Sequence, residues 1–80
     1  MPLRLVFLGR LQDLAGACER QVEEAARVTV ADLIATLEPH LASELASERV
    51  RIAVNGALAS RATTVSDGDE VAFLPPVSGG

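Results

Sequence analysis

The sequence ends in two glycines, Gly79 and Gly80, after a double proline at Pro75 and Pro76. Prolines favour an extended chain, and glycines lack the Cβ atom that would block passage through a narrow opening. Fully extended, residues 75–80 reach at most about 20 Å, which is enough to place the terminal carboxylate inside a pocket of another protein. A carboxylate becomes a good electrophile only when one oxygen is made a leaving group, so this chemistry requires ATP and an adenylating partner. Considered alone, a Gly-Gly end is also typical of a terminus without a function.

The other side chains that could do chemistry are isolated from one another. Cys18 is the single cysteine, and Arg20 is its one basic neighbour in the sequence, so we interpret it as incidental or structural rather than as a persulfide acceptor. His40 follows the proline at position 39, with no Ser, Cys or acidic pattern that would recruit it for catalysis, and we expect it at the surface. Cys18 and His40 are too few ligands for a zinc site, and we expect no metal.

Length and composition restrict the classes of protein that remain. Eighty residues predict a single domain over residues 1–80, with residues 75–80 as a C-terminal tail. Hydrophobic residues make up 49% of the chain and only Phe7 and Phe73 are aromatic, so the core must be mainly aliphatic. The net charge is −4, all seven basic residues are Arg, and Trp and Tyr are absent. This composition argues against nucleic acid as a partner.

Hydropathy also argues against a membrane protein. The longest apolar runs fall far short of the roughly 20 residues that a membrane helix needs, and no signal-peptide pattern opens the sequence. We therefore expect a cytoplasmic protein with no membrane partner.

The elements that must position the C-terminal segment begin with one predicted helix. Thr29 is a favoured N-cap type, and Asp32 follows three residues later as in a capping box. Pro39 disfavours helical geometry in the residue before it, so the helix is predicted from Thr29 to about Glu38, with an irregular turn over 41–48. Apolar residues recur at helical spacing and predict one buried stripe: Val30, Leu33, Ile34, Leu37 and Leu41.

Short apolar or alternating runs predict the strands. The Asn55-Gly56 pair suits a type I′ hairpin turn, and Gly16 closes a helical turn that begins at Arg10. The predicted strands are Leu3–Leu8, Cys18–Glu24 (a polar edge strand), Val50–Asn55, Ala57–Ser60 and Glu70–Leu74. This order of elements predicts an α+β fold, with one mixed β-sheet and one main helix packed on one face.

Alternation along the strands predicts that the second face of the sheet is partly apolar. Arg4, Arg51 and Glu70 mark this outer face, since charged residues point away from a core. The same alternation puts several apolar side chains beside them: Val6, Leu8, Ala53, Ala72 and Leu74. An exposed patch of this size indicates a site for a partner. Cover by a loop is the alternative.

The C-terminal stretch DGDEVAFLPPVSGG, residues 67–80, resembles the end of the molybdopterin synthase small subunit (MoaD family), a ubiquitin-like β-grasp sulfur carrier. The resemblance extends over nearly the whole chain. It includes the first strand and loop, the start of the helix and the hairpin, at residues 7–16, 29–33 and 53–56.

The resemblance implies a cycle of sulfur transfer in molybdenum cofactor biosynthesis. An adenylating enzyme (MoeB type) would use ATP to convert the Gly80 carboxylate, which follows Gly79, into an acyl adenylate, and a sulfur donor protein would convert that into a thiocarboxylate (1-thioglycine). The tail would then enter the large synthase subunit (MoaE type) of a heterotetramer, which supplies the acid and base groups. Sulfur would pass to cyclic pyranopterin monophosphate, and the dithiolene of molybdopterin needs two such turnovers. The chain itself would bind no cofactor.

The resemblance also implies contact residues. The hydrophobic contacts of the family with the large subunit fall on Leu8, Leu58 and Leu74, and two of these belong to the outer face predicted by alternation. The tail contacts fall on Pro75, Pro76, Val77 and Ser78.

Three other functions are compatible with the same residues. The chain could be a thiamine-type or other sulfur carrier, with the double proline favouring the molybdopterin branch. It could be a ubiquitin-like modifier whose Gly80 is conjugated to lysines of target proteins, or a plain interaction domain that uses the outer face alone.

Overall fold

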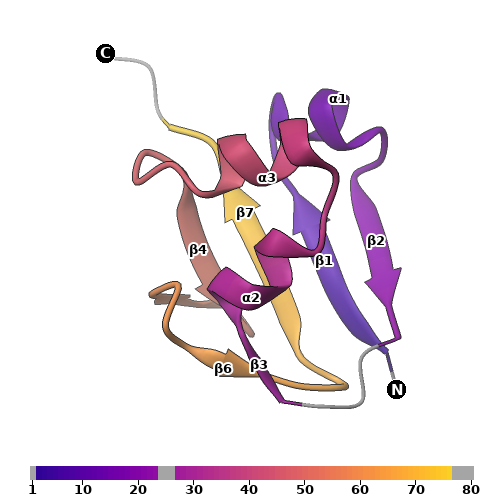
Figure 1. The fold of residues 1–80 in the computed structure, drawn as a ribbon, viewed down its shortest axis with the longest axis vertical. Helices are drawn as coiled ribbons and strands as arrows, with labels where there is room; N and C mark the ends of the chain where they lie inside the picture. Colours follow the sequence, from indigo (N-terminus) through magenta and orange to yellow (C-terminus); the bar gives the residue numbers. More distant parts are fainter. Residues whose placement is uncertain (1, 24–26, 77–80) are drawn as a thin grey trace.

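The first and last strands lie side by side within a five-stranded sheet. The computed structural model describes residues 2–23 and 27–76 (Figure 1). Strand β1 (Leu3–Phe7) pairs in parallel with β7 (Glu70–Leu74), whereas the other pairs of this sheet are antiparallel. The strand order is β2-β1-β7-β4-β5, with β2 (Glu19–Val22) and β5 (Ala57–Ala59) at the edges and β4 (Arg51–Val54) next to β7. The predicted α+β class, the mixed sheet and the edge position of the second strand are confirmed.

The chain has two short helices where the sequence predicted one main helix. Helix α2 (Val30–Ala35) starts as predicted, since the Thr29 hydroxyl oxygen accepts a hydrogen bond from the Asp32 backbone N–H at 3.1 Å. It ends at Ala35 in a tightened last turn, where the Thr36 backbone N–H and hydroxyl both donate to the Leu33 carbonyl, at 3.1 and 2.7 Å. Pro39 then begins a new helix, α3 (Pro39–Leu45), where we expected only an irregular turn.

Both helices cover one face of the sheet, and the core lies between them and the strands (Figure 1). Helix α1 (Leu11–Ala15) contacts β1 and α3 and ends at Gly16 in the left-handed conformation. The Phe7 and Phe73 rings stack with centroids 5.6 Å apart. The remaining buried core residues are aliphatic, as predicted: Leu3, Leu5, Leu11, Val30, Leu33, Ile34, Leu41, Leu45, Val50, Ile52, Val65 and Val71.

The sequence predicted the hairpin turn correctly but missed the two shortest strands. The hairpin between β4 and β5 turns at Asn55 and Gly56, which have φ angles of 50° and 87°, as a type I′ turn requires. The sequence did not predict β3 (Val28–Thr29) and β6 (Thr64–Val65), which pair as a separate two-stranded sheet. Strands of two residues are too short to show an alternating pattern.

Within the described ranges 2–23 and 27–76, no helix has the length and apolar character needed to cross a membrane.

Candidate functional site

The sheet register assembles an apolar row across the face opposite the helices. Val6 is the register partner of Ala72, Ala72 of Ala53, and Ala53 of Leu58, so the row crosses β1, β7, β4 and β5 in turn. Leu74 lies two residues after Ala72 and points to the same face, and Leu8 follows the end of β1. We call this set the outer patch: Val6, Leu8, Ala53, Leu58, Ala72 and Leu74.

The outer patch has small side chains at its centre and large exposed ones at two of its outer positions. Ala53 and Ala72 are half-buried and contribute only methyl groups. Leu58 is 68% exposed and Leu8 is 38% exposed, and they are two of the three large exposed hydrophobic residues in the described part of the chain. Their exposure contradicts the alternative that a described loop covers this face at those two positions. A partner could therefore reach both leucines directly.

Charged side chains border the outer patch on both sides. The Arg4 guanidinium donates a hydrogen bond to the Glu70 carboxylate, and its Nε lies 3.7 Å from Oε2 of Glu19. Arg51 is the register partner of Leu74 and is exposed at the other side. An apolar centre with a charged border is the usual anatomy of a protein interface.

Two turns hold the beginning of β7 in place. The Asn55 side chain donates to Oδ1 of Asp69 at 3.0 Å and accepts from the Glu70 backbone N–H at 2.9 Å. Asp69 also accepts from the Ser66 backbone N–H at 2.9 Å. The hydrogen bond from Asn55, with the Ser66 N–H second, lowers the pKa of the Asp69 carboxyl below its ordinary value. This network fixes the strand that leads to the C-terminal segment.

The end of β7 is tied to the end of β1. The Leu8 backbone N–H donates to the Phe73 carbonyl at 3.1 Å, one residue before β7 ends at Leu74. Pro75 and Pro76 follow and are half-buried. Thus the structure brings Leu8, Leu58 and Leu74 to one face and starts the tail at the end of the central strand. The tail residues Val77, Ser78, Gly79 and Gly80 lie outside the described residues.

Two features of this surface were not accessible to alternation along the sequence. Leu58 lies in a three-residue strand, and only its register with Ala53 assigns it to the outer face. The resemblance to a known family had pointed to it independently. Gly9 lies in the turn after β1, and a Cβ atom at this position would lie 2.9 Å from Cγ of Pro75, a long-range approach that no local pattern encodes. Cys18 and His40 are both exposed.

A mixed five-stranded sheet with helices on one face, and a C-terminal segment leaving its central strand, defines the class of ubiquitin-like β-grasp proteins. The chain belongs to the ThiS family, which matches residues 5–80.

Two relatives resemble the chain over nearly its full length. One, from Haemophilus influenzae, is 31% identical over 80 residues, which covers 98% of this chain and 99% of the relative. The other, from Mycobacterium tuberculosis, is 33% identical over 82 residues, which covers 98% and 96%. Both bear the name molybdopterin synthase sulfur carrier subunit.

Solved structures confirm the fold. Small archaeal modifier protein 1 (SAMP1) of Haloferax volcanii superposes with a TM-score of 0.80 at 28% identity, with full coverage of both chains. A chain from the complex of subunits 1 and 2 of the molybdopterin-converting factor of Helicobacter pylori gives 0.68 at 25% identity, again with full coverage of both. The thiamine biosynthesis protein ThiS of Geobacter metallireducens gives 0.61 at 30% identity and full coverage of both.

Proposed function

We propose that this chain is the sulfur-carrier subunit of a molybdopterin synthase and acts as one domain, with residues 75–80 as its reactive arm. The observation that carries the proposal is the match, over nearly the full length of each chain, to two proteins with that name. The Gly-Gly end and the outer patch support it, because a carrier needs a presentable carboxylate and a surface on which its partners can dock.

The proposed chemistry takes place at Gly80 in two steps. In the site of a MoeB-type enzyme, a carboxylate oxygen attacks the α-phosphorus of ATP, which forms an acyl adenylate and releases pyrophosphate. Hydrosulfide released by a donor protein then attacks the acyl carbon and displaces AMP, and loss of the sulfur-bound proton leaves a thiocarboxylate. Gly79 contributes the absence of a side chain, so that the arm can enter a narrow channel.

The charged carrier then docks on a large subunit of MoaE type. The complex of subunits 1 and 2 from Helicobacter pylori supports a partner of this kind. We propose that Leu8, Leu58 and Leu74 contact the partner and that residues 75–78 line its entrance. Sulfur passes to cyclic pyranopterin monophosphate, and the acid and base groups belong to the large subunit.

Intact-mass spectrometry tests this proposal. After incubation with a MoeB-type enzyme, ATP and a sulfur source, the chain should show exchange of one oxygen for sulfur, located at Gly80 by fragmentation. A variant that lacks Gly79 and Gly80 is the control, and it should remain folded but unmodified, because the described core uses none of the tail residues. An unchanged mass in a system that charges a known carrier would overturn the proposal.

A second candidate is a ubiquitin-like modifier, and its specific support is the TM-score of 0.80 with an archaeal modifier protein. It predicts covalent adducts of higher mass in cell extract that vanish when Gly80 is deleted. The thiamine-type carrier, supported by the likeness to ThiS, predicts the same thiocarboxylate but no co-purification with a large synthase subunit.

A further inference from the structure

Gly9 lies close to Pro75, the first residue after β7. Gly9 lies in the turn between β1 and α1 with a φ angle of +55°. A Cβ atom at this position would lie 2.9 Å from Cγ of Pro75, a separation at which one of the two groups must shift. The Pro75 ring therefore occupies the space that any side chain at position 9 would need.

Backbone hydrogen bonds and the proline ring restrict movement on both sides of this approach. The Gly9 carbonyl accepts a hydrogen bond from the Gln12 N–H at 3.1 Å, and the Leu8 N–H donates to Phe73 at 3.1 Å. The turn at Gly9 is thus held by α1 through Gly9 itself and by β7 through its neighbour Leu8. The Pro75 ring is closed onto its own backbone nitrogen, so a change of ring pucker is the only movement of Cγ that leaves the main chain in place. A methyl group at position 9 would press on this ring at the point where the chain leaves β7.

The other glycines with positive φ angles in the described residues differ in this respect. Gly16, Gly56 and Gly68 have φ angles of 80°, 87° and 90°, and a Cβ atom on any of them would meet nothing within 4 Å. Their conformation serves local turns only. Gly9 also has a positive φ angle, but a Cβ atom on it would in addition meet Pro75 at the start of the tail.

We infer that Gly9 is a positioning residue for the C-terminal arm. By leaving room for the Pro75 ring against the β1–α1 turn, it fixes the point and the direction in which the chain leaves the sheet. This inference rests on the proposed function, since the direction matters only if Gly80 must reach a partner's reaction site. A displacement of about 1 Å in reacting groups can cost up to roughly 100-fold in rate.

The test compares Gly9→Ala with Gly16→Ala. Both variants place one methyl group on a left-handed glycine next to α1, so both carry similar backbone strain, but only Gly9→Ala meets Pro75. The assay is pyrophosphate release with a MoeB-type enzyme and ATP, at a temperature where circular dichroism shows both variants folded. For Gly9→Ala we expect kcat to fall roughly tenfold with KM unchanged, because the outer patch is intact. Gly16→Ala should retain the kcat of the wild type.

A double-mutant cycle assigns the effect to the contact. Pro75→Ala removes Cγ, so Gly9→Ala should have no further effect on kcat in that background. Nuclear Overhauser effects between the Gly9 Hα protons and the Pro75 ring protons should be visible in the wild type. Equal kcat values for Gly9→Ala and Gly16→Ala, additive effects in the cycle, or missing Overhauser effects would each overturn the inference. Failure of the wild type to release pyrophosphate would instead contradict the proposed function, and the Overhauser effects would still report on the contact.

Discussion

At the scale of single residues, Asn55 and Asp69 show how two local turn signals become one long-range connection. Asn55 adopts a positive φ angle in the hairpin turn, a conformation that Asn tolerates better than most residues. Its amide also reaches Asp69, 14 residues later, at 3.0 Å. The sequence predicted the turn at Asn55 and Gly56, because turn chemistry is local. It did not predict the hydrogen bond from Asn55 to Asp69, which depends on how β4 and β7 pair.

This hydrogen bond predicts a pH dependence of stability. The pKa of Asp69 is lowered in the folded chain, so its ionised carboxylate stabilises the fold above the ordinary pKa of 3.8, and this contribution is lost as pH falls through the lowered value. We expect Asp69→Asn to reduce the free energy of unfolding at pH 7 by up to about 1 kcal/mol, because solvent still screens this half-buried group. The difference in the free energy of unfolding between Asp69→Asn and wild type should become smaller below pH 4.

Urea unfolding at pH 7, 5 and 3 measures this difference. Asp67→Asn is the matched control, since it removes the same charge from an exposed position in the same turn. A difference between wild type and Asp69→Asn that stays constant with pH, or that Asp67→Asn reproduces, would contradict the assignment.

At the scale of elements, the helical region shows what periodicity can and cannot resolve. The predicted stripe is buried at Val30, Leu33, Ile34 and Leu41, and Leu37 packs against it. The stripe does not reveal that Leu41 belongs to a second helix, because two consecutive helices on the same face keep the apolar spacing. The break follows from the Thr36 hydrogen bond and from Pro39. The pairing of β3 with β6 likewise joins residues far apart in the sequence, so no local pattern predicts it.

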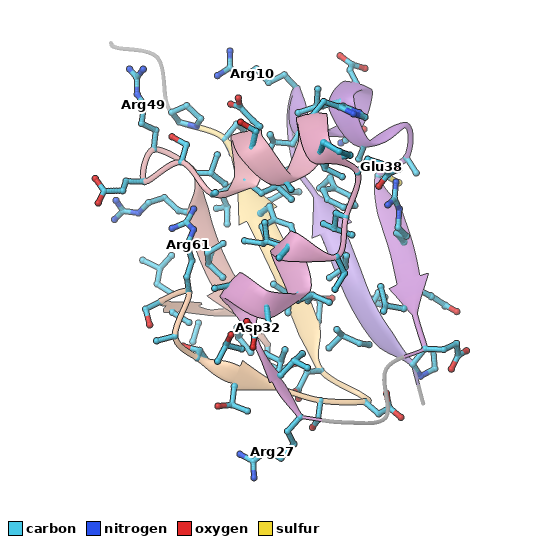
Figure 2. The ribbon with its side chains drawn as sticks, viewed as in Figure 1. Arg10, Arg27, Asp32, Glu38, Arg49 and Arg61 are labelled. Atoms are coloured by element: carbon cyan, nitrogen blue, oxygen red, sulfur yellow. The ribbon has the colours of Figure 1, made fainter. Side chains whose placement is uncertain are left out.

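One arginine joins α3 to the sheet. The Arg61 guanidinium donates to the carbonyls of Leu45, Ser47 and Val50 at 2.7, 2.6 and 2.8 Å, and so connects the end of α3 to the residue before β4. Figure 2 shows Arg61 directed at this loop, whereas Arg49, in the same loop, extends outward. All three carbonyls contact the same nitrogen, Nη2, and Nε donates a second hydrogen bond to the Leu45 carbonyl at 3.2 Å. A lysine ammonium carries all its donors on one nitrogen, so it cannot supply the Nε contact.

We therefore expect Arg61→Ala to lower the free energy of unfolding by about 2 kcal/mol, because carbonyls lose charge-assisted hydrogen bonds. Arg61→Lys should recover only part of this loss, while Arg49→Ala should lie within about 0.5 kcal/mol of wild type. Urea denaturation measures all three variants. If the free energy of unfolding of Arg61→Lys matches that of wild type, one cationic nitrogen suffices and the second donor at Nε contributes nothing.

At the scale of the whole molecule, one face of the sheet packs on the core and the other is open to solvent. The helices cover one face, and the described core residues lie there. The opposite face carries the outer patch, whose most exposed member is Leu58. Alternation predicted this division from β1, β4 and β7, while the short strand β5 needed the register. Because the core does not use Leu58, binding and stability should respond separately to substitution there.

Leu58→Asp tests this separation. Leu58 is 68% exposed, so its replacement should change the melting temperature little. If the outer patch docks on a large synthase subunit, a buried aspartate at its edge should cost about 2 kcal/mol or more, which raises Kd roughly 30-fold, as at an interface hot spot. Isothermal titration with the purified large subunit measures this change.

Leu14→Asp is the matched control, since it adds the same charge at another exposed leucine. Leu14 lies on α1, where it lines a groove together with Arg10 and Glu44. Helix α1 contacts α3, and Leu14 is not part of the outer patch. It should bind the large subunit as tightly as wild type. Equal weakening by both substitutions would mean that added negative charge, and not the outer patch, governs assembly. If Leu58→Asp binds the large subunit as tightly as wild type, the part of the outer patch around Leu58 does not belong to the interface.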